Sequence, residues 1–491
     1  MKLWFSLLIS VLSIALAILP TVLVAQESPP AAFDPAAIDR FVTEQMETQR
    51  VPGLALAITR GEEVLYLKGY GSANGQQPIT PQTQFLIASL SKSFTAVAVL
   101  QLVEAGQIEL DAPVQRYLPD FTLADAAAAK TITVRQLLNQ VSGLGDTGFP
   151  EMRLPAPATL AERITQMQRA RLAAAPGTSY IYFNVNYQIL ARIVEVVSGQ
   201  PFSTYLHDYL FVPLAMSNTT NIMSSRDLAQ TPPDLAQGHL LLFGEPFATG
   251  EERGFLGGSG GVVSNAEDMT HFLLMQSNGG RYQGATLLSP QSVDLLHTPP
   301  ADIISPYAMG WWEGNTANGV HYLEHNGILS TFYSEMVLLP QTGQSFVLLY
   351  NIHSLAHDML GAPAIKDGLI DLLSGNVPSP GRLTVTLWEA IFGVLLLISL
   401  FFEVRGLWRL SAWPQQVATQ PFWLLSLIIL WAFVPAVFVL TMPWLVLRSS
   451  GRAFGYITLF RSMLEVMSWL ALCGVLGALN GGIRLGSLLR R

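Results

Sequence analysis

The chain has 491 residues, enough for two or three domains, and its 27 lysine and arginine residues stand against 35 aspartate and glutamate residues, a net charge of −8. This acidic balance, together with the lack of a basic patch that contains interleaved aromatic residues, argues against nucleic-acid binding. Half of the residues are hydrophobic and only 13% are charged, below the usual fraction of about a quarter, and charged residues are scarcest at the two ends of the chain.

The first 25 residues have the layout of a signal peptide. Lys2 precedes an apolar run from Leu3 to Leu19, and Ala25 offers a cleavage site. An uncleaved anchor helix is the alternative, and either segment predicts that the following chain is exported. Residues 26–37 are rich in proline and alanine and are expected to form a short linker.

Residues 38–378 are expected to form a soluble enzyme domain, with strand patterns near both of its ends and mostly helical patterns between them. The expected elements are a helix at Ala36–Glu47, strands at Leu54–Thr59 and Val64–Tyr70, helices from about residue 90 to 105 and at Asn186–Gly199, strands at Gly319–Leu323, Thr331–Leu339 and Ser345–Tyr350, and a helix at His353–Leu373. One sheet assembled from both ends of the domain, with a helical insertion, predicts an α+β fold.

The segment Ser89-Leu90-Ser91-Lys92 is the first motif with a chemical meaning. At the start of a helix, residues three apart share one face, so the hydroxyl of Ser89 and the amine of Lys92 can form a hydrogen bond. A serine hydroxyl needs a nearby base to act as a nucleophile at neutral pH. Lysine provides that base only where burial or positive charge keeps it partly neutral. The alternative is that Ser89 simply caps the helix.

Three apolar stretches follow the enzyme domain, within residues 383–483, and each is long enough to span a bilayer as a helix. They are Leu383–Phe402, Phe422–Leu447 and Met463–Ile483. Pro435 and Pro443 can kink the second of them. The only cysteine, Cys473, lies in the third stretch, which excludes an intramolecular disulfide.

The arginines that flank these stretches predict their orientation. If the N-terminus directs export, Arg405, Arg409, Arg484, Arg490 and Arg491 lie inside, and Arg448, Arg452 and Arg461 lie outside. The positive-inside rule agrees by a small margin, which places the enzyme domain on the extracytoplasmic side and residues 484–491 in a basic cytoplasmic tail. Glu389 and Glu465, near the outer ends of two spans, are expected to be solvated or paired with the outer arginines.

Seven sequence blocks occur between Ile38 and Pro378. They are FLIASLSKSFTA, ITVRQLLNQVSGL, PGTSYIYFNVNYQILARIVEVVSGQPF, FVPLAMSNT, GGSGGVVSNAEDMTHFL, YAMGWW and EHNG. In this order they resemble the serine β-lactamase and penicillin-binding-protein-like hydrolases, in particular the branch of class C β-lactamases, D,D-peptidases and related esterases. The resemblance implies an antiparallel sheet flanked by helices beside an all-helical subdomain, with the active site between them.

The same resemblance implies roles for individual residues. Ser89 is expected to be the nucleophile that forms an acyl-enzyme, and Lys92 and Tyr182 are expected to transfer protons, with Lys92 lowering the pKa of Tyr182. Asn184, in the Tyr182-Phe183-Asn184 element, is expected to donate to a substrate carbonyl and to bind Lys92. The backbone N–H groups of Ser89 and Ile328 are expected to form the oxyanion hole.

The sequence departs from the family pattern at His325-Asn326-Gly327, where most β-lactamases have lysine first. Histidine is common at this place in the esterase and D-aminopeptidase relatives. Because His325 is only partly charged near pH 7, its recognition of a substrate carboxylate is in doubt. Gly327 is expected to let the strand approach the substrate. Gln140 stands where the family often has histidine, and Gly257–Gly261 is expected to be a flexible loop near the cleft or a plain connection.

These observations predict an exported, membrane-anchored serine hydrolase that cleaves an amide or ester bond in cell-wall or D-amino-acid peptides, small esters or β-lactams. The expected partners are such a substrate and the lipid bilayer. The sequence lacks zinc-type ligand spacing and a P-loop, so we expect no metal and no cofactor. The alternative is a sensor module that captures penicillins or peptidoglycan fragments without turnover and is coupled to the membrane helices.

Overall fold

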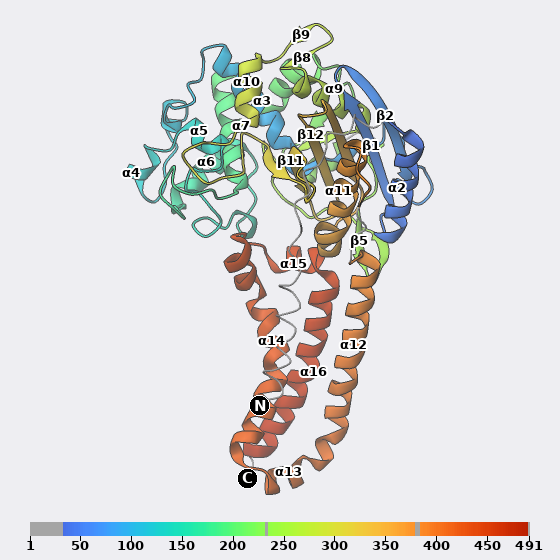
Figure 1. Ribbon diagram of the computed structural model, residues 1–491. Helices are drawn as coiled ribbons and strands as arrows, with labels where there is room; N and C mark the ends of the chain where they lie inside the picture. Colours follow the sequence, from blue (N-terminus) through green and yellow to red (C-terminus); the bar gives the residue numbers. More distant parts are fainter. Residues whose placement is uncertain (1–32, 231–233, 379–382, 490–491) are drawn as a thin grey trace.

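The computed structural model describes residues 33–230, 234–378 and 383–489. Residues 35–378, called the head below, form a body of sheet and helices, and three long helices extend from one side of it (Figure 1). The expected signal peptide, most of the expected linker and the last two arginines lie outside the described residues.

A six-stranded antiparallel sheet forms the centre of the head, in the order β10-β11-β12-β13-β1-β2. Its strands are β1 (Gly53–Arg60), β2 (Glu63–Gly71), β10 (Trp312–Asn315), β11 (His321–Ile328), β12 (Tyr333–Leu339) and β13 (Gln344–Tyr350). β1 pairs with β13 in the register Leu56 opposite Leu348, so the two ends of the head meet in the middle of the sheet. This arrangement confirms the predicted α+β class.

Both faces of the sheet are covered, which explains why β1, β12 and β13 are apolar almost throughout. Alternate residues of β1 belong to different cores: Ala55 and Ala57 pack on one side, and Leu54, Leu56 and Ile58 on the other. The second side is covered by α2 (Pro35–Thr48) and α11 (Ala362–Leu373), and the first by α9 (Ala266–Ser277).

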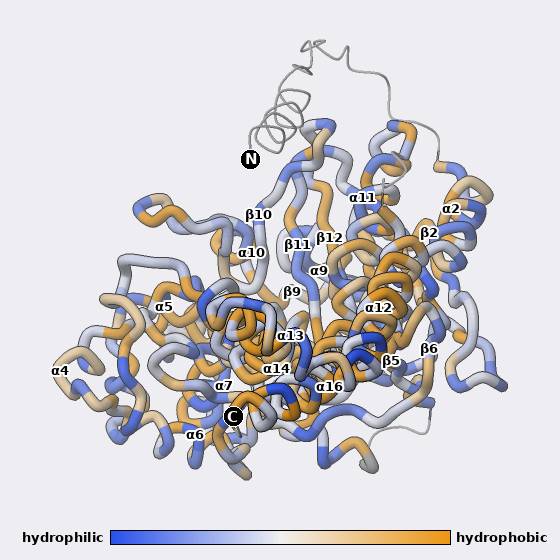
Figure 2. The backbone as a smooth tube through the Cα atoms, turned by 90° about the horizontal axis from the view of Figure 1, so that it is seen from below, coloured by the Kyte–Doolittle hydropathy of each residue, from blue (hydrophilic) through white to orange (hydrophobic). Residues whose placement is uncertain are grey.

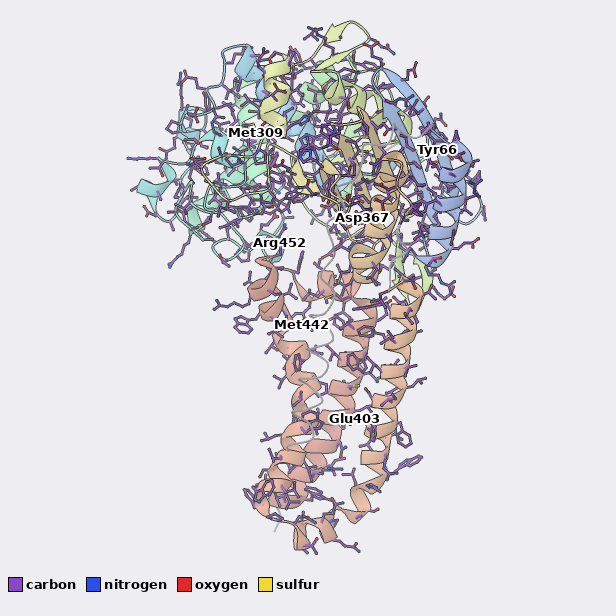
Figure 3. The ribbon with its side chains drawn as sticks, in the orientation of Figure 1. Tyr66, Met309, Asp367, Glu403, Met442 and Arg452 are labelled. Atoms are coloured by element: carbon purple, nitrogen blue, oxygen red, sulfur yellow. The ribbon has the colours of Figure 1, made fainter. Side chains whose placement is uncertain are left out.

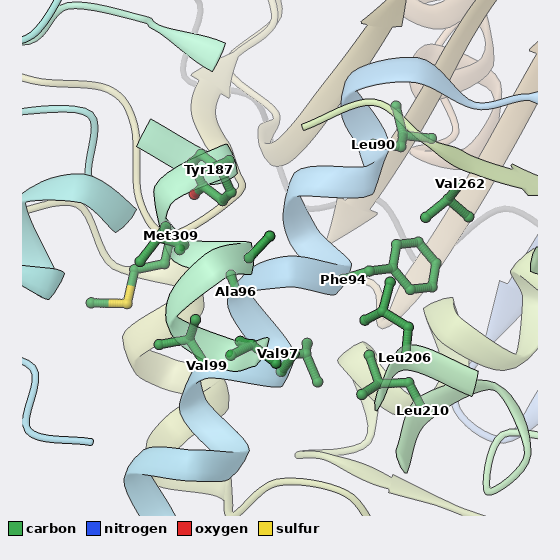
Figure 4. Packing of buried hydrophobic residues seen from close by; sticks show 14 of the residues in the cluster. Leu90, Phe94, Ala96, Val97, Val99, Tyr187, Leu206, Leu210, Val262 and Met309 are labelled. Atoms are coloured by element: carbon green, nitrogen blue, oxygen red, sulfur yellow. The ribbon is translucent and has the colours of Figure 1, made fainter. Parts of the chain in front are cut away.

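Helices beside the sheet form the second part of the predicted architecture (Figure 1). The longest are α3 (Ser91–Glu104) and α7 (Asn184–Ser198), which pack against each other, and α5 (Val134–Leu138), α6 (Leu160–Gln166), α8 (Phe202–Leu206) and α10 (Pro290–His297) are shorter. Nearly every side chain of α3 is buried, consistent with its apolar sequence. Figure 4 shows Phe94 and Val97 of α3 among side chains that include Leu206 of α8.

Several boundaries differ from the sequence-based expectations. The Asp34 carboxylate accepts hydrogen bonds from the N–H groups of Ala36 and Ala37, so α2 begins inside the expected linker. The strand expected to end at Leu323 continues to Ile328, because the residues that follow pair with β12. β10 was not expected. The helix expected from His353 begins instead at residue 355 and contains a π-helical turn at His357–Gly361.

Three helices, α12 (Val385–Trp408), α14 (Phe422–Ser450) and α16 (Leu464–Leu489), are long and apolar enough to cross a membrane. α16 runs into the expected cytoplasmic tail. Seen from below, apolar residues dominate these three helices, which we call the helix bundle (Figure 2). A Cβ at Gly477 of α16 would lie 2.1 Å from the carbonyl oxygen of Ala432 in α14, so small residues allow the close approach of these two helices. α14 continues through Pro435 and Pro443.

The bundle is attached to the head at more than one place. At the start of α12, the Val385 N–H donates to Gln49 Oε1 at 3.0 Å, and the Thr386 hydroxyl donates to the carbonyl of Thr48 at 2.9 Å. On the other side, α15 (Tyr456–Ser462), between α14 and α16, places the Thr458 hydroxyl 2.9 Å from Glu252 Oε1. The head therefore contacts the bundle at two separate places in addition to the chain connection that leads into α12.

The expectation that Glu389 and Glu465 are solvated or paired with outer arginines is wrong. Each residue is only 4% exposed, and no ion pair to either is present in the described part of the chain. Both face the turn at Phe243 and Gly244, which joins β5 (His239–Leu242) to β6 (Glu245–Ala248). This hairpin occupies the space at the top of the helices where water was expected.

Candidate active site

Ser89 lies in a 3₁₀ turn, Ala88–Leu90, directly before α3. The turn is fixed by neighbouring segments: the Ile87 N–H donates to the carbonyl of Val262 at 3.1 Å, and the Ser91 hydroxyl donates to the carbonyl of Ala88 at 2.6 Å. Ala88 has φ +49°, a left-handed conformation that costs free energy for a residue other than glycine. Ser89 itself is partly exposed between buried neighbours. The hydroxyl is thus presented from a rigid, strained turn.

Lys92 lies one helical turn later, and its amine points back to the serine. The Nζ atom is 2.9 Å from Ser89 Oγ and 2.8 Å from the carbonyl oxygen of Ser259, and the residue is fully buried. No carboxylate is within ion-pair distance of this amine among the described residues. Burial, aided by the positive charge of Arg452, holds the pKa of Lys92 well below its ordinary value. These are the conditions under which lysine acts as a base.

The segment Gly257–Gly261 is buried, and the expectation of a flexible loop is wrong. A Cβ at Gly258 would lie 2.6 Å from the carbonyl oxygen of Tyr187, and one at Gly261 only 2.0 Å from that of Ile222. Glycine is therefore required for close packing, and the resulting tight turn directs the Ser259 carbonyl at Lys92. Sequence reasoning identified the glycines but missed this acceptor.

Tyr182 is held in place by Gln140, for which the sequence suggested no role. The Gln140 carbonyl accepts from the Ile181 N–H at 2.9 Å, and its side-chain oxygen accepts from the Phe183 N–H at 3.0 Å. The same oxygen accepts from Asn186 Nδ2 at 2.6 Å. Gln140 thus forms hydrogen bonds with the backbone of the residues on both sides of the tyrosine.

The Tyr182 ring lies between the groups that define the site. Lys92 Nζ is 4.9 Å from its centre, and the ring stacks on Trp312 at 5.4 Å. Its hydroxyl approaches Ser89 without forming a hydrogen bond of ordinary geometry. Burial raises the pKa of Tyr182, and the interactions with Ser89 and Arg452 offset this only in part. The expected lowering of the Tyr182 pKa is thus outweighed by burial, and Arg452 rather than Lys92 is the cation that opposes the rise.

Asn184 does not bind Lys92 as expected. Its Nδ2 atom donates to Glu151 Oε1 at 2.8 Å, and the buried Glu151 carboxylate also lies 3.5 Å from the Arg163 guanidinium. A buried carboxylate must be paired and hydrogen-bonded, and Asn184 meets part of this requirement. The Glu151–Arg163 pair was not apparent from the sequence, because neither residue lies in a recognisable motif.

His325 is fully buried and does not face open solvent. Its Nε2 atom is 3.2 Å from the Tyr307 hydroxyl, its Nδ1 atom is 2.7 Å from the Asn326 carbonyl, and its ring centre is 4.4 Å from that of Trp312. Burial, with a smaller contribution from Lys92, lowers the pKa of His325 to about 3. The histidine expected to be partly charged near pH 7 is therefore neutral at that pH.

Gly327 brings β11 against the serine turn, whereas the sequence suggested an approach to substrate. A Cβ at Gly327 would lie 2.4 Å from the carbonyl oxygen of Ile87 and 3.0 Å from the Cβ of Ala88. The next residue, Ile328, ends the strand and is 40% exposed. The two backbone N–H groups expected to form an oxyanion hole, those of Ser89 and Ile328, thus belong to adjoining segments.

The arrangement can activate a serine hydroxyl by a desolvated amine, beside a tyrosine and next to a strand edge. Within the described part of the chain, no group of three or more histidine, cysteine, aspartate or glutamate side chains is suited to hold a metal ion.

Comparison with known proteins gives matches over the head. A protein-family profile described as Beta-lactamase matches residues 38–369. Protein flp of Staphylococcus aureus (strain MW2) is 28% identical over 333 residues, covering 65% of this chain and 63% of that protein, so the match spans less than two thirds of its length. Penicillin-binding protein 4 of Amycolatopsis lactamdurans is 30% identical over 337 residues, covering 64% of this chain and 84% of that protein.

Solved structures share the fold. The octameric penicillin-binding protein homologue from Pyrococcus abyssi has a TM-score of 0.59 and 24% identity, covering 74% of this chain and 82% of that chain. EstCE1, a hydrolase with promiscuous acyltransferase activity, has a TM-score of 0.54 and 21% identity, covering 64% of this chain and 93% of that chain.

Proposed function

Because the chain belongs to the Beta-lactamase family, we propose that it is a serine hydrolase that cleaves an amide or ester bond through an acyl-enzyme on Ser89. One observation carries this proposal: a fully buried lysine amine without a carboxylate partner among the described residues lies 2.9 Å from the serine hydroxyl. A charged lysine in that place would be costly, whereas a neutral one can accept the serine proton.

In the proposed reaction, Lys92 Nζ takes the proton as Ser89 Oγ forms a bond to the carbonyl carbon. The negative charge that develops on the carbonyl oxygen is stabilised by the N–H groups of Ser89 and Ile328, at about 3 kcal/mol per donor. The leaving group departs with a proton passed through Tyr182, which burial keeps protonated. Water then attacks the ester carbon, and Ser89 regains its proton.

Asn184 and His325 have a different part in this proposal from the direct substrate contacts expected at first. Their polar atoms are engaged with Glu151, Tyr307 and the backbone of Asn326. We assign both a positioning role, Asn184 through the 151–163 segment and His325 through the aromatic cluster around Tyr182. Small esters, cell-wall or D-amino-acid peptides and β-lactams remain the candidate substrates.

The proposal includes export and membrane anchoring. It is supported by the signal-like N-terminus of the sequence and by three helices of sufficient length and apolarity. The head would then lie on the extracytoplasmic side, since the arginines follow the positive-inside rule in that orientation.

The test uses the full chain in detergent with p-nitrophenyl butyrate. We expect a burst or steady release of p-nitrophenol that Ser89→Ala abolishes and Lys92→Met lowers by at least about 100-fold. Lys68→Met is the matched control, because Lys68 is exposed and paired with Asp39 outside the site. Release that persists unchanged in Ser89→Ala would refute the proposal.

The sensor hypothesis remains the second candidate, and one observation favours it: a loop of the helix bundle contacts the head beside Tyr182. A sensor would capture a substrate and keep it. A stable acyl adduct on Ser89, detected by mass spectrometry and not discharged over hours, would favour the sensor, and repeated turnover would exclude it.

A further inference from the structure

The loop between α14 and α15, residues 451–455, lies against the head at the active site. Arg452 Nε is 2.8 Å from Asp146 Oδ2, and the Asp146 side chain is fully buried while that of Arg452 is 17% exposed. Ala453, the next residue, is fully buried. Figure 3 shows Arg452 where the helix bundle meets the head. The bundle thus contributes a charged side chain at the head's surface.

The loop is fixed by contacts on both sides of Arg452. Arg153 of the head donates from Nε to the carbonyl of Phe454 at 3.0 Å and from Nη2 to that of Pro443 at 2.9 Å. The guanidinium of Arg461, in α15, donates to the carbonyl of Gly250. Arg452 is therefore held in place rather than swinging freely in solvent.

Arg452 lies over the same tyrosine as the proposed base. Its guanidinium carbon is 5.5 Å from the ring centre of Tyr182, and Lys92 Nζ is 4.9 Å from that centre. Asp146 engages the Nε edge, and Nη2 has only a weak contact with the sulfur of Met152 at 3.7 Å. No partner for Nη1 is found among the residues that the structure describes. Part of the guanidinium is therefore available to a ligand.

A second observation makes this charge significant. The H-N-G strand supplies a neutral histidine, and Lys92 is desolvated, so neither provides a permanent positive charge to a substrate. Arginine remains charged at all relevant pH values and binds carboxylates through paired N–H donors. The charged groups near Arg452 include the carboxylates of Asp146 and Glu151, the amine of Lys92, and the guanidinium of Arg153, which binds the carbonyl of Phe454; the Glu151 carboxylate is paired with Arg163.

We propose that Arg452 completes the active site from the helix bundle and binds a carboxylate of the substrate. This inference rests on the proposed hydrolase function and names the class of substrate: esters or amides that carry a carboxylate close to the bond to be cleaved. The site is complete only when the bundle is docked on the head.

The experiment compares two esters of the same length, p-nitrophenyl pentanoate and mono-p-nitrophenyl glutarate, with full-length protein in detergent. Arg452→Gln is expected to lower kcat/KM for the glutarate ester by about 10- to 100-fold relative to the pentanoate ester, mainly through KM. The ratio of kcat/KM for the two esters in Arg452→Lys should lie between the ratios of the wild-type protein and of Arg452→Gln. Arg448→Gln is the matched control, because Arg448 lies exposed in the last turn of α14, shortly before the loop, and over Trp444.

Both esters are measured at a pH where the rate with the neutral ester no longer changes, so that a shift in the pKa of Lys92 does not alter the comparison. An unchanged ratio, or an equal change in Arg448→Gln, would overturn the inference. Faster cleavage of both esters by Arg452→Gln would also overturn it, since the loop would then be an obstruction.

A binding measurement separates this inference from the proposed function. Calorimetry can measure binding of the glutarate ester to Ser89→Ala protein, because this needs no turnover. In the double variant Ser89→Ala, Arg452→Gln, the Kd should rise by the same factor of about 10 to 100 that is expected for kcat/KM. If wild-type protein cleaves neither ester but this binding difference is found, the hydrolase proposal fails and the carboxylate site stands. If binding is equal in both variants, the carboxylate site is refuted.

Discussion

Gly327→Ala tests whether the close packing of β11 on the serine turn sets the geometry of the site. The added Cβ would lie 2.4 Å from the carbonyl oxygen of Ile87 and 2.3 Å from Ser334 Oγ. Restoring an ordinary contact requires the strand and the turn to separate by about 1 Å, and a misplacement of that size can cost about 100-fold in rate. Overpacking of this kind also destabilises a protein by about 1–3 kcal/mol.

We expect kcat/KM for p-nitrophenyl butyrate to fall about 100-fold in Gly327→Ala. The midpoint of thermal unfolding should fall as well. Gly254→Ala is the control, since a Cβ at Gly254 meets no atom within 4 Å. Adding Ser334→Ala removes one clash but leaves the backbone oxygen of Ile87, so it should not restore activity. Wild-type kinetics in Gly327→Ala would show that this contact does not determine the oxyanion geometry.

Three further predictions concern the base, the tyrosine segment and the bundle. Because burial lowers the pKa of Lys92 and its neutral form is the active one, kcat/KM should rise with pH and reach its plateau well below the ordinary lysine value of about 10.4; a rise centred near that value in a pH–rate profile would contradict the assignment. Gln140→Ala leaves two buried N–H donors without an acceptor, at about 1–3 kcal/mol each, and should lower both kcat and the midpoint of thermal unfolding. If the midpoint falls but kcat keeps its wild-type value, Gln140 contributes to stability and not to the geometry of the site. Gly477→Val should force α14 and α16 apart at Ala432 and lower the thermal stability in detergent, while Gly482→Val, with no atom within 4 Å, should not.

Much of the fold could be predicted from the sequence, because it depends on local patterns. The strands next to both ends of the head follow the apolar runs at Leu54–Thr59 and Ser345–Tyr350, and the three spans follow uninterrupted apolar stretches. β10 was missed because its sequence, Trp312–Asn315, includes glycine and two polar residues and becomes a strand only by pairing with β11.

The parts of the candidate site that depend on local helix geometry could be predicted from the sequence. The parts that depend on burial by residues distant in the sequence could not. The three-residue spacing of Ser89 and Lys92 is sufficient to place their atoms in contact on one helical turn. The neutral state of His325 could not be foreseen, because it depends on the aromatic residues that enclose it. Arg452 is separated from Tyr182 by 270 residues of sequence, and nothing in its local context distinguishes it from an arginine that only flanks a membrane span.

The separate attachments between head and bundle have a mechanical consequence. The start of α12 is fastened at Gln49, the α14–α15 loop at Asp146, and α15 at Glu252, and Figure 1 shows α12 and α15 at different positions under the head. Attachment at three places restricts the tilting and rotation of the head on the bundle more than attachment at one place would. If the bundle spans a membrane as proposed, these attachments would limit the change in height and orientation of the head above the lipid surface, and molecules in or on that surface would reach Ser89 from a limited range of directions.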